Sequence, residues 1–394
     1  MKQIKRYLIY ASSIIFSRGI EYIVLLFAAY YLSKHEYGEL EFYKKCIELG
    51  STFIAFGLPS LIMSYTRSSK SKINFYVLSL IFSITLACIF FVFLFWTPYF
   101  FLVIPFLFNA VFFTGGITHS YILVHKSSVY AAALKAIISA SFYTVLFILI
   151  YFFQYESLSY VYVSYVLIIP LIVFIFFELK SQYDKTLIKI RSYLGLFRKL
   201  ILGSLTLVLS NFINIMFLYT DIFILKLLSE DSNADIANYS FSLNIASVLL
   251  IIPMTIVQVE IENLKLNRVN VNKINNRIRL LTSVLTIGLI FGFLSLTEQL
   301  FFDFRETFVL FLIVISAKIF QSLSTFYGTM MVIKKQFKIN FIINIIAFFG
   351  NIFMSLVLFP KFGLYGIATA SMISLGLRKF TLVYYFNSII RAKH

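Results

Sequence analysis

The chain has 394 residues, of which 60% are hydrophobic and only 13% are charged, and its formal net charge is +17. A soluble domain is about 45–50% apolar and about 25% charged, so these proportions exclude a protein whose whole surface faces water. The excess of Lys and Arg does not indicate nucleic-acid binding, because basic residues collect in the cytoplasmic loops of membrane proteins.

Apolar segments alternate with short polar connections along the whole chain. A helix needs about 20 apolar residues to cross a bilayer. The segments that satisfy this criterion are 7–32, 46–66, 73–96, 100–123, 129–153, 158–178, 200–228, 237–259, 280–297, 307–333, 339–358 and 364–388, of which 280–297 is the shortest. The first follows the basic start Met1–Arg6 and has no small-residue cleavage site, which predicts a retained helix rather than a signal peptide.

A basic stretch, residues 180–199, divides these segments six and six. An even number of spans in each half gives both halves the same direction, as in parallel repeats. The sequence therefore predicts an all-α polytopic membrane protein with about twelve transmembrane helices in two parallel six-helix lobes around a central cavity. The predicted parts are an N-terminal lobe (1–179), a basic cytoplasmic linker (180–199) and a C-terminal lobe (200–394).

The loop charges predict the orientation. If the N-terminus is cytoplasmic, 23 of the 34 Lys and Arg residues lie in cytoplasmic connections, and 5 lie in outer ones. This asymmetry predicts that both termini are cytoplasmic. Residues 33–45 then form an outer loop, and Glu48 with Lys44 and Lys45 forms a salt-bridged group at the outer mouth of the second span.

Charged residues inside the spans are the strongest functional signal, because each costs roughly 2.5–3.5 kcal/mol at the centre of a bilayer and usually faces a cavity or a partner. They are Arg18, Glu21, Lys135, Asp221, Lys226, Lys318, Arg378 and Lys379. A cavity lined mostly by cations suits a phosphate or pyrophosphate group. The candidates for such a cationic cavity are Arg18, Lys135, Lys318 and Arg378.

Several of these residues have a structural alternative. Arg18 and Glu21 are three residues apart and can neutralise each other. Lys135 and Lys226 lie near the ends of their spans and can extend to the interface. Arg378 is preferred to the adjacent Lys379 because its planar guanidinium grips phosphate better.

Glu21 and Asp221 are the candidates for an ion-coupling carboxylate, with H+ or Na+ as the coupling ion. Pairing of Asp221 with Lys226 is the alternative, although five residues is poor helical spacing. The candidates for hinges are Gly57, Pro59 and Pro253, because proline interrupts the helical hydrogen bonds, whereas Gly115–Gly116 favours close helix packing.

No catalytic residue, metal site or bound cofactor is predicted. The four histidines are scattered, and Cys46 and Cys88 fit two free thiols. The short cytoplasmic loops contain no phosphate-binding loop. An ion gradient or another protein would have to supply the energy.

Short motifs in both halves resemble one family. Leu32–Gly38 resembles the L-x-x-x-E-Y-G turn of polysaccharide flippases, and Gly57–Ser60 follows at the expected distance. Tyr219–Leu225 resembles the Asp-bearing stretch of that family, and Ala237–Ser240 resembles its Y-S start of the eighth span. Gly363–Ala368 resembles its G-x-x-G-x-A start of the twelfth span. The chain thus resembles the Wzx-type flippases of the multidrug/oligosaccharidyl-lipid/polysaccharide exporter superfamily.

The resemblance implies a carrier in the bacterial cytoplasmic (inner) membrane rather than an enzyme. Such a flippase moves an undecaprenyl-pyrophosphate-linked oligosaccharide, the repeat unit of an O-antigen or capsule, from the inner to the outer leaflet by alternating access. Its partners would be this lipid-linked substrate, membrane lipid, a polysaccharide polymerase and a chain-length regulator, and not nucleic acid. Arg18, Asp221 and the basic residues of the spans are the candidate residues carried over.

Other functions remain open. An O-antigen polymerase, which is a membrane glycosyltransferase, usually has a large outer loop with several Arg residues, whereas the outer connections contain only Arg305. A cation-coupled small-molecule antiporter of the same superfamily would need a cluster of carboxylates, and only Glu21 and Asp221 qualify. A major-facilitator carrier would carry a Gly/Asp/Arg signature, which residues 67–72 lack.

Overall fold

The computed structural model describes residues 2–65, 68–113, 116–126, 128–154, 157–183, 188–253, 255–257, 264, 271–334 and 336–391. These residues form helices joined by short connections, and no strand occurs among them. They belong to two compact units. The first comprises Met1–Ala28 with Tyr43–Phe212, and the second comprises Ala29–Phe42 with Ile213–His394.

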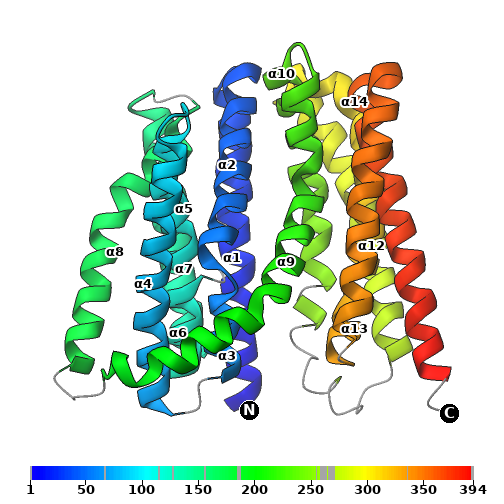
Figure 1. Cartoon of the computed structure of the whole chain (residues 1–394). Coiled ribbons are helices and arrows are strands. Elements are labelled where there is room, and N and C mark those ends of the chain that lie inside the picture. Colours follow the sequence, from blue (N-terminus) through cyan, green and yellow to red (C-terminus); the bar gives the residue numbers. More distant parts are fainter. Residues whose placement is uncertain are drawn as a thin grey trace. The chain divides into compact units, whose positions relative to one another are not determined.

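The first unit is a bundle of helices. Its elements are α1 (Lys2–Tyr31) up to Ala28, α2 (Lys34–Ala55) from Tyr43 on, α3 (Leu58–Tyr65), α4 (Ser69–Leu94), η1 (Phe100–Leu102), α5 (Val103–Phe112), α6 (Ile117–His125), α7 (Ser128–Tyr151), α8 (Ser159–Tyr183) and the first part of α9 (Ile190–Leu228). Helix α6 packs against α3, α4 and α7. In Figure 1 the first part of α9 runs crosswise to α4, and Phe197 of this part lies 5.6 Å from Phe75 of α4 between ring centroids.

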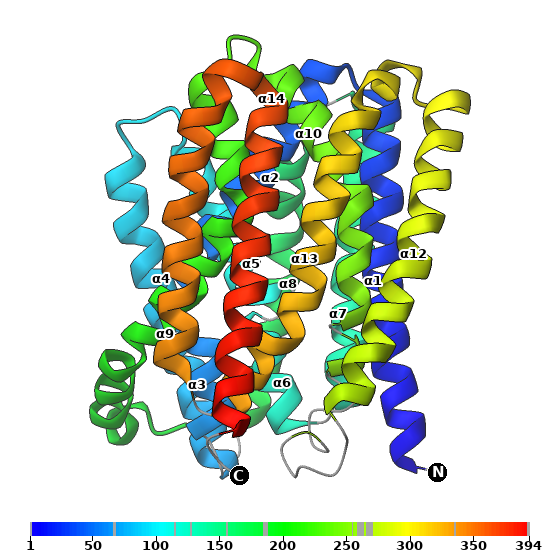
Figure 2. The same cartoon turned by 90° about the vertical axis from the view of Figure 1, so that its right-hand side faces the viewer.

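The second unit is centred on α13. Its further elements are α10 (Ser232–Ser247), η2 (Val248–Leu250), α12 (Val271–Gln299), η3 (Phe302–Thr307), α13 (Phe308–Ile333) and α14 (Phe337–Arg391). Helix α13 packs against α10, α12 and α14 (Figure 2). The rings of Phe293 and Phe311 are stacked at 4.0 Å and join α12 to α13.

Helix α14 consists of two arms that are folded back at Gly363. This residue has φ 54° and ψ −132°, a conformation that glycine adopts without the steric cost of a Cβ. Figure 2 shows the orange arm before the turn beside the red arm after it. Gly366 lies just beyond the turn, and a Cβ added there would be only 2.5 Å from the carbonyl oxygen of Leu358. The two arms can therefore meet at this point only through a residue without a side chain.

Eight helical stretches of the described residues are long and apolar enough to cross a membrane. They are Ser69–Leu94, Phe100–His125, Val129–Tyr151, Ser159–Ser181, Ser232–Val257, Val271–Gln299, Phe302–Met331 and Lys338–Ser388. The last has 51 residues and contains two predicted spans. The chain is thus an all-helical, multi-pass membrane protein. The predicted spans 7–32, 46–66 and 200–228 fall on α1, on α2 with α3, and on α9, and the count of twelve stays a prediction.

Large apolar side chains on the surface are typical of a membrane protein. Phe93 in the first unit is 77% exposed, and Phe353 in the second unit is 69% exposed. Soluble proteins rarely expose extended apolar patches, whereas lipid solvates such side chains. Trp96 is 89% exposed just after α4 ends, where the sequence predicts the outer membrane interface.

The predicted outer loop over residues 33–45 is wrong, because α2 begins at Lys34. The start of α2 is a reciprocal capping box. The backbone N–H of Ser33 donates to Glu36 Oε2 at 2.8 Å, and the backbone N–H of Glu36 donates to Ser33 Oγ at 3.3 Å. The charged residues of this stretch lower its hydropathy, although Lys44 and Lys45 are buried. A criterion based on apolar length therefore misses the first half of the helix.

Other predicted boundaries also shift. Helix α12 begins at Val271 instead of residue 280, and α10 begins at Ser232 instead of residue 237. The start of α10 is capped by Asp231, which accepts a hydrogen bond from the backbone N–H of Ala234 at 3.3 Å. Polar residues in these first turns again hide the helix from a hydropathy criterion.

Two of the predicted spans are interrupted. Between α2 and α3, Phe56 has φ 41° and Gly57 has φ 68°, so both lie in the left-handed region. Between α5 and α6, a Cβ added to Gly116 would lie 2.8 Å from the carbonyl oxygen of Ala110. Gly116 thus allows a sharp local turn rather than contact with another helix, and Gly115 lies outside the described residues.

Candidate functional site

Polar residues on one face of α1 connect it to α7. Ser13, Ser17 and Glu21 are four residues apart, so they share a face of the helix. Ser13 Oγ donates to the carbonyl oxygen of Ala132 at 2.8 Å, and the hydroxyls of Ser17 and Ser139 share a hydrogen bond of 2.6 Å. These contacts orient Glu21 toward the interior of the first unit, where it is buried.

Charged side chains from α1 and α2 meet in this interior. We call Arg18, Glu21, Lys44, Lys45 and Glu48 the Glu21 cluster. Arg18 Nη1 donates to Glu21 Oε2 at 2.7 Å, and Lys44 Nζ lies 3.4 Å from Glu21 Oε1. Lys45 Nζ lies 3.6 Å from Glu48 Oε2. The predicted pairing of Arg18 with Glu21 is present, and Lys44, which the sequence predicts at an outer interface, is a second partner of Glu21.

The members of the Glu21 cluster differ in accessibility. The side chain of Arg18 is 42% exposed, whereas those of Glu21 and Lys44 are 9% and 2% exposed. The cluster contains three cations and two carboxylates, so its formal charge is positive. Arg18 is the more exposed member of its pair with Glu21, and its guanidinium has donors left over from this bond, so it is a candidate for contact with an anion.

Lys135 of α7 belongs to the same region. It is buried, and it interacts electrostatically with both Arg18 and Glu21. A lysine that extended to the membrane interface would be exposed at its head, so this burial favours an interior role. Lys135 adds a further positive charge on the side of α1 that faces α7.

A second polar site lies in the second unit around Asp221 of α9. Asp221 is buried and accepts hydrogen bonds from three helical segments, which are α10 and the two arms of α14. Asn351 Nδ2 donates to Asp221 Oδ1 at 3.0 Å, and Ser371 Oγ donates to Oδ2 at 2.5 Å. The hydroxyl of Tyr239 on α10 also donates to Oδ2. The carboxylate is thus held by α10 and by both arms of α14.

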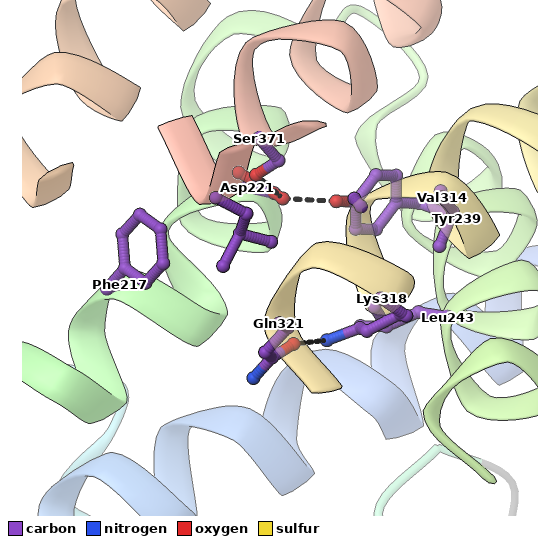
Figure 3. Close-up of a pocket in the computed structure, with 10 residues that line it drawn as sticks. Phe217, Asp221, Tyr239, Leu243, Val314, Lys318, Gln321 and Ser371 are labelled. Atoms are coloured by element: carbon purple, nitrogen blue, oxygen red, sulfur yellow. Dashed lines mark hydrogen bonds between the residues drawn. The ribbon is translucent and has the colours of Figure 1, made fainter. Parts of the chain in front are cut away.

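A pocket opens beside this carboxylate, and we call it the Asp221 pocket. Its lining includes Phe217, Asp221, Tyr239, Leu243, Val314, Ala317, Lys318, Gln321, Ser371 and Leu375. Figure 3 shows Lys318 and Gln321 on α13, with Lys318 Nζ donating to Gln321 Oε1 at 2.7 Å. Lys318 also attracts Asp221 electrostatically. A carboxylate beside a cation and neutral hydroxyls can exchange a proton or bind a small hard cation through oxygen ligands.

The proposed pairing of Asp221 with Lys226 does not form. Lys226 Nζ donates instead to Asn233 Oδ1 at 2.6 Å and lies 5.2 Å from the ring centroid of Phe42. Five residues along a helix place Asp221 and Lys226 on different faces. Lys226 therefore has a structural role near the start of α10.

Arg378 and Lys379 point to different surroundings, as adjacent helical residues must. Arg378 is buried, its Nε donates to Asn344 Oδ1 at 2.9 Å, and its Cζ lies 5.9 Å from the ring centroid of Phe217. Lys379 Nζ lies 5.4 Å from the ring centroid of Phe320. Since Phe217 also lines the Asp221 pocket, Arg378 lies close to that pocket.

The hinge candidates have different positions. Gly57 is in the break before α3, and Pro59 is the second residue of α3. Proline fits the first turn of a helix because no backbone N–H is needed there, so the interruption lies at Gly57 and not at Pro59. Pro253 is buried just after η2.

Sequence reasoning missed the uncharged partners of the site. Tyr239, Asn351 and Ser371 hold Asp221, and Asn344 holds Arg378. A polar Asn side chain is costly inside an apolar span because lipid does not solvate it. Asn344 and Asn351 could therefore have been identified from the sequence. In the part of the chain that the structure describes, no group of three or more His, Cys, Asp or Glu residues could hold a metal ion.

Comparison with known structures places the fold. The chain is similar to the lipid II flippase MurJ in an inward closed conformation, with a TM-score of 0.62 and 14% identity over 96% of this chain and 87% of that chain. It is also similar to an inward-facing multidrug resistance MATE family transporter of the MOP superfamily, with a TM-score of 0.60 and 16% identity over 97% and 95%. A mutant of the Vibrio cholerae MATE transporter VcmN has a TM-score of 0.58 and 10% identity over 98% and 97%.

Sequence comparison gives the family. No curated protein matches the chain. The family described as polysaccharide biosynthesis protein matches residues 4–261, which is more than half of the 394 residues. This protein therefore belongs to the polysaccharide biosynthesis protein family, and its fold is that of the MurJ and MATE transporters.

Proposed function

We propose that the protein is a flippase for an undecaprenyl-pyrophosphate-linked oligosaccharide, the repeat unit of an O-antigen or capsule. The observation that carries the proposal is the Glu21 cluster, which brings the partly exposed side chain of Arg18 and the buried cation Lys44 to the same carboxylate. Cations inside a membrane bundle suit a pyrophosphate group better than a neutral sugar. Membership of the polysaccharide biosynthesis family supports the same class of substrate.

The headgroup would bind through its pyrophosphate to Arg18, with Lys135 as a further cation of the same unit. The polyprenyl tail would stay in lipid while the protein alternates between inward and outward access. Lys318 and Arg378 remain candidates for contacts with the oligosaccharide or its phosphates. The protein would act as a carrier, and no residue is assigned a catalytic role.

Energy would come from an ion gradient acting at Asp221. Protonation or Na+ binding would change the charge of this buried carboxylate, which Tyr239 of α10 and Asn351 and Ser371 of the two arms of α14 contact directly. Conformational coupling requires an ion that interacts differently with two states of the carrier. Asp221 is suited to this role because its hydrogen-bond donors lie on α10 and on both arms of α14, so a movement of these segments would change the surroundings of a bound ion.

The cellular setting follows from the same proposal. The protein would span the bacterial inner membrane with both termini in the cytoplasm, and it would deliver repeat units to a polymerase and a chain-length regulator. Membrane lipid and the lipid-linked oligosaccharide are its other partners, and it has no role for nucleic acid.

Deletion of the gene in the native host tests the function. Surface polysaccharide and lipid-linked intermediates are analysed together, with a strain that is complemented by the wild-type gene as the control. A flippase predicts that undecaprenyl-linked units accumulate on the inner face and that the surface polymer disappears. Single repeat units on the surface without long chains would instead identify a polymerase. An unchanged profile in a strain without a second flippase would favour a small-molecule antiporter.

A further inference from the structure

Glu21 bridges two cations in the interior of the first unit. Its two carboxylate oxygens contact two different cations, because Oε2 accepts from Arg18 at 2.7 Å and Oε1 lies 3.4 Å from Lys44. One of these cations comes from α1 and the other from α2. A phosphoryl group presents pairs of oxygens in a similar arrangement and forms charge-assisted hydrogen bonds to the same donors.

We propose that Glu21 is a built-in counter-ion, which the pyrophosphate group of the substrate displaces from Arg18 and Lys44. This inference rests on the proposed function and deepens it, since it assigns the residue that controls access to the anion site. Buried cations without a counter-ion are strongly destabilising. Glu21 stabilises the empty carrier, and the ligand takes over its role when it binds.

The structure also offers a place for the displaced carboxylate. Tyr143 of α7 is 1% exposed, and among the residues that the structure describes its buried hydroxyl has no hydrogen-bond partner. It interacts electrostatically with both Glu21 and Arg18, so it belongs to the same region. A rotated Glu21 would accept the proton of this hydroxyl in a hydrogen bond and would so satisfy both buried groups.

The exchange favours a particular class of ligand. To displace Glu21, a ligand must attract Arg18 and Lys44 at least as strongly as the carboxylate does. A neutral sugar cannot do so. A pyrophosphate carries more than one negative charge and several oxygens, so it can contact Arg18 and Lys44 together. Glu21 thus acts as a filter that rejects headgroups of low charge, because they do not displace it.

Binding measurements on the full-length protein in lipid nanodiscs test this assignment. Inorganic pyrophosphate and inorganic phosphate are titrated by calorimetry into the wild type and the variants. Glu21→Gln removes the competing charge, and we expect it to bind pyrophosphate about tenfold more tightly, which corresponds to about 1.4 kcal/mol. Glu21→Asp is too short to reach both cations, and we expect an intermediate gain. Tyr143→Phe removes the alternative partner, and we expect weaker binding.

Glu178→Gln is the matched control, because Glu178 pairs with Lys126 at 2.7 Å in the same unit but outside the Glu21 cluster. Pyrophosphate affinity should be unchanged in this variant. Equal or weaker binding by both folded Glu21 variants would overturn the counter-ion assignment, because Glu21 would then support the cations instead of competing for them. A failure of the flippase proposal itself would be seen in a different experiment, because the deletion strain would then make normal surface polymer.

Discussion

At the scale of single residues, the cations of each unit differ in what they contact. We expect Arg18→Ala to impair polysaccharide export, because it removes the partly exposed cation of the Glu21 cluster. Arg378→Ala should also impair export, because it removes a buried cation next to the Asp221 pocket. Complementation of the deletion strain measures export, and immunoblotting of membranes measures protein levels.

Lys379→Ala is the control for Arg378, since Lys379 is adjacent in sequence but lies against Phe320 and Phe380. It should complement like the wild type. Normal export by both arginine variants, at normal protein levels, would contradict the hypothesis that these cations bind an anionic substrate.

Asp221 allows a test that separates charge from packing. We expect Asp221→Asn to fold but to lose the dependence of transport on the ion gradient, because the carboxamide has nearly the same shape without the charge. Asp221→Ala should also lower the free energy of unfolding, since each buried donor left unsatisfied costs about 1–3 kcal/mol. Thermal unfolding in detergent and export in the presence of ionophores give the two readouts.

The control for Asp221 is Asp235→Asn. Asp235 accepts a hydrogen bond from Ser229 at 2.6 Å near the start of α10, away from the pocket. Its substitution should leave the ion dependence of transport unchanged. Full ion dependence in Asp221→Asn would place the coupling step at another residue.

The sequence identifies part of each site. Arg18, Glu21, Asp221 and Lys318 stand out because a charge inside an apolar segment is costly and therefore rare. Their partners could not be found in the same way. Ser371 is uncharged and lies 150 residues from Asp221, and serine is common in membrane helices, where it can bond to its own backbone.

At the scale of elements, hydropathy predicts the central parts of helices better than their ends. The first half of α2 is polar in composition, yet the capping box of Ser33 and Glu36 marks its start in the sequence. The break at Gly57 and the turn at Gly363 depend on left-handed backbone conformations. The sequence indicates the position of both, since Gly57 is a hinge candidate and Gly363 lies between the predicted spans 339–358 and 364–388. It does not give the backbone angles, because glycine permits these conformations but does not require them.

The turn in α14 gives a prediction about packing. Gly366→Ala should destabilise the protein, because the added Cβ would lie 2.5 Å from the carbonyl oxygen of Leu358 and would push the two arms apart. Gly350→Ala on the same helix is the matched control, since no atom lies within 4 Å of its added Cβ. Alanine forms helices better than glycine by about 1 kcal/mol, so the control should be neutral or stabilising. Thermal unfolding in detergent measures both variants, and equal stability would contradict this packing.

At the scale of the whole molecule, composition predicts the membrane class and the loop charges predict the orientation. Helix α4 is suited to a test of the orientation, because the structure describes all of its residues and both of its ends. Its 26 residues extend about 39 Å at a rise of about 1.5 Å per residue, which exceeds the hydrocarbon thickness of about 30 Å. The helix is therefore long enough for its two ends to lie on opposite sides of the membrane.

Reporter fusions at the ends of the helices determine which side each end occupies. We expect alkaline phosphatase fused after Thr97 to be active, because Thr97 follows α4 on the predicted outer side and the enzyme matures only outside the cytoplasm. The same fusion after Tyr183, at the end of α8, should be inactive, because the basic stretch 180–199 is predicted to remain inside. Fluorescent protein fused at either position gives the opposite pattern and controls for expression. Activity after Tyr183 with none after Thr97 would show the inverted orientation, with the basic stretch 180–199 outside the cytoplasm.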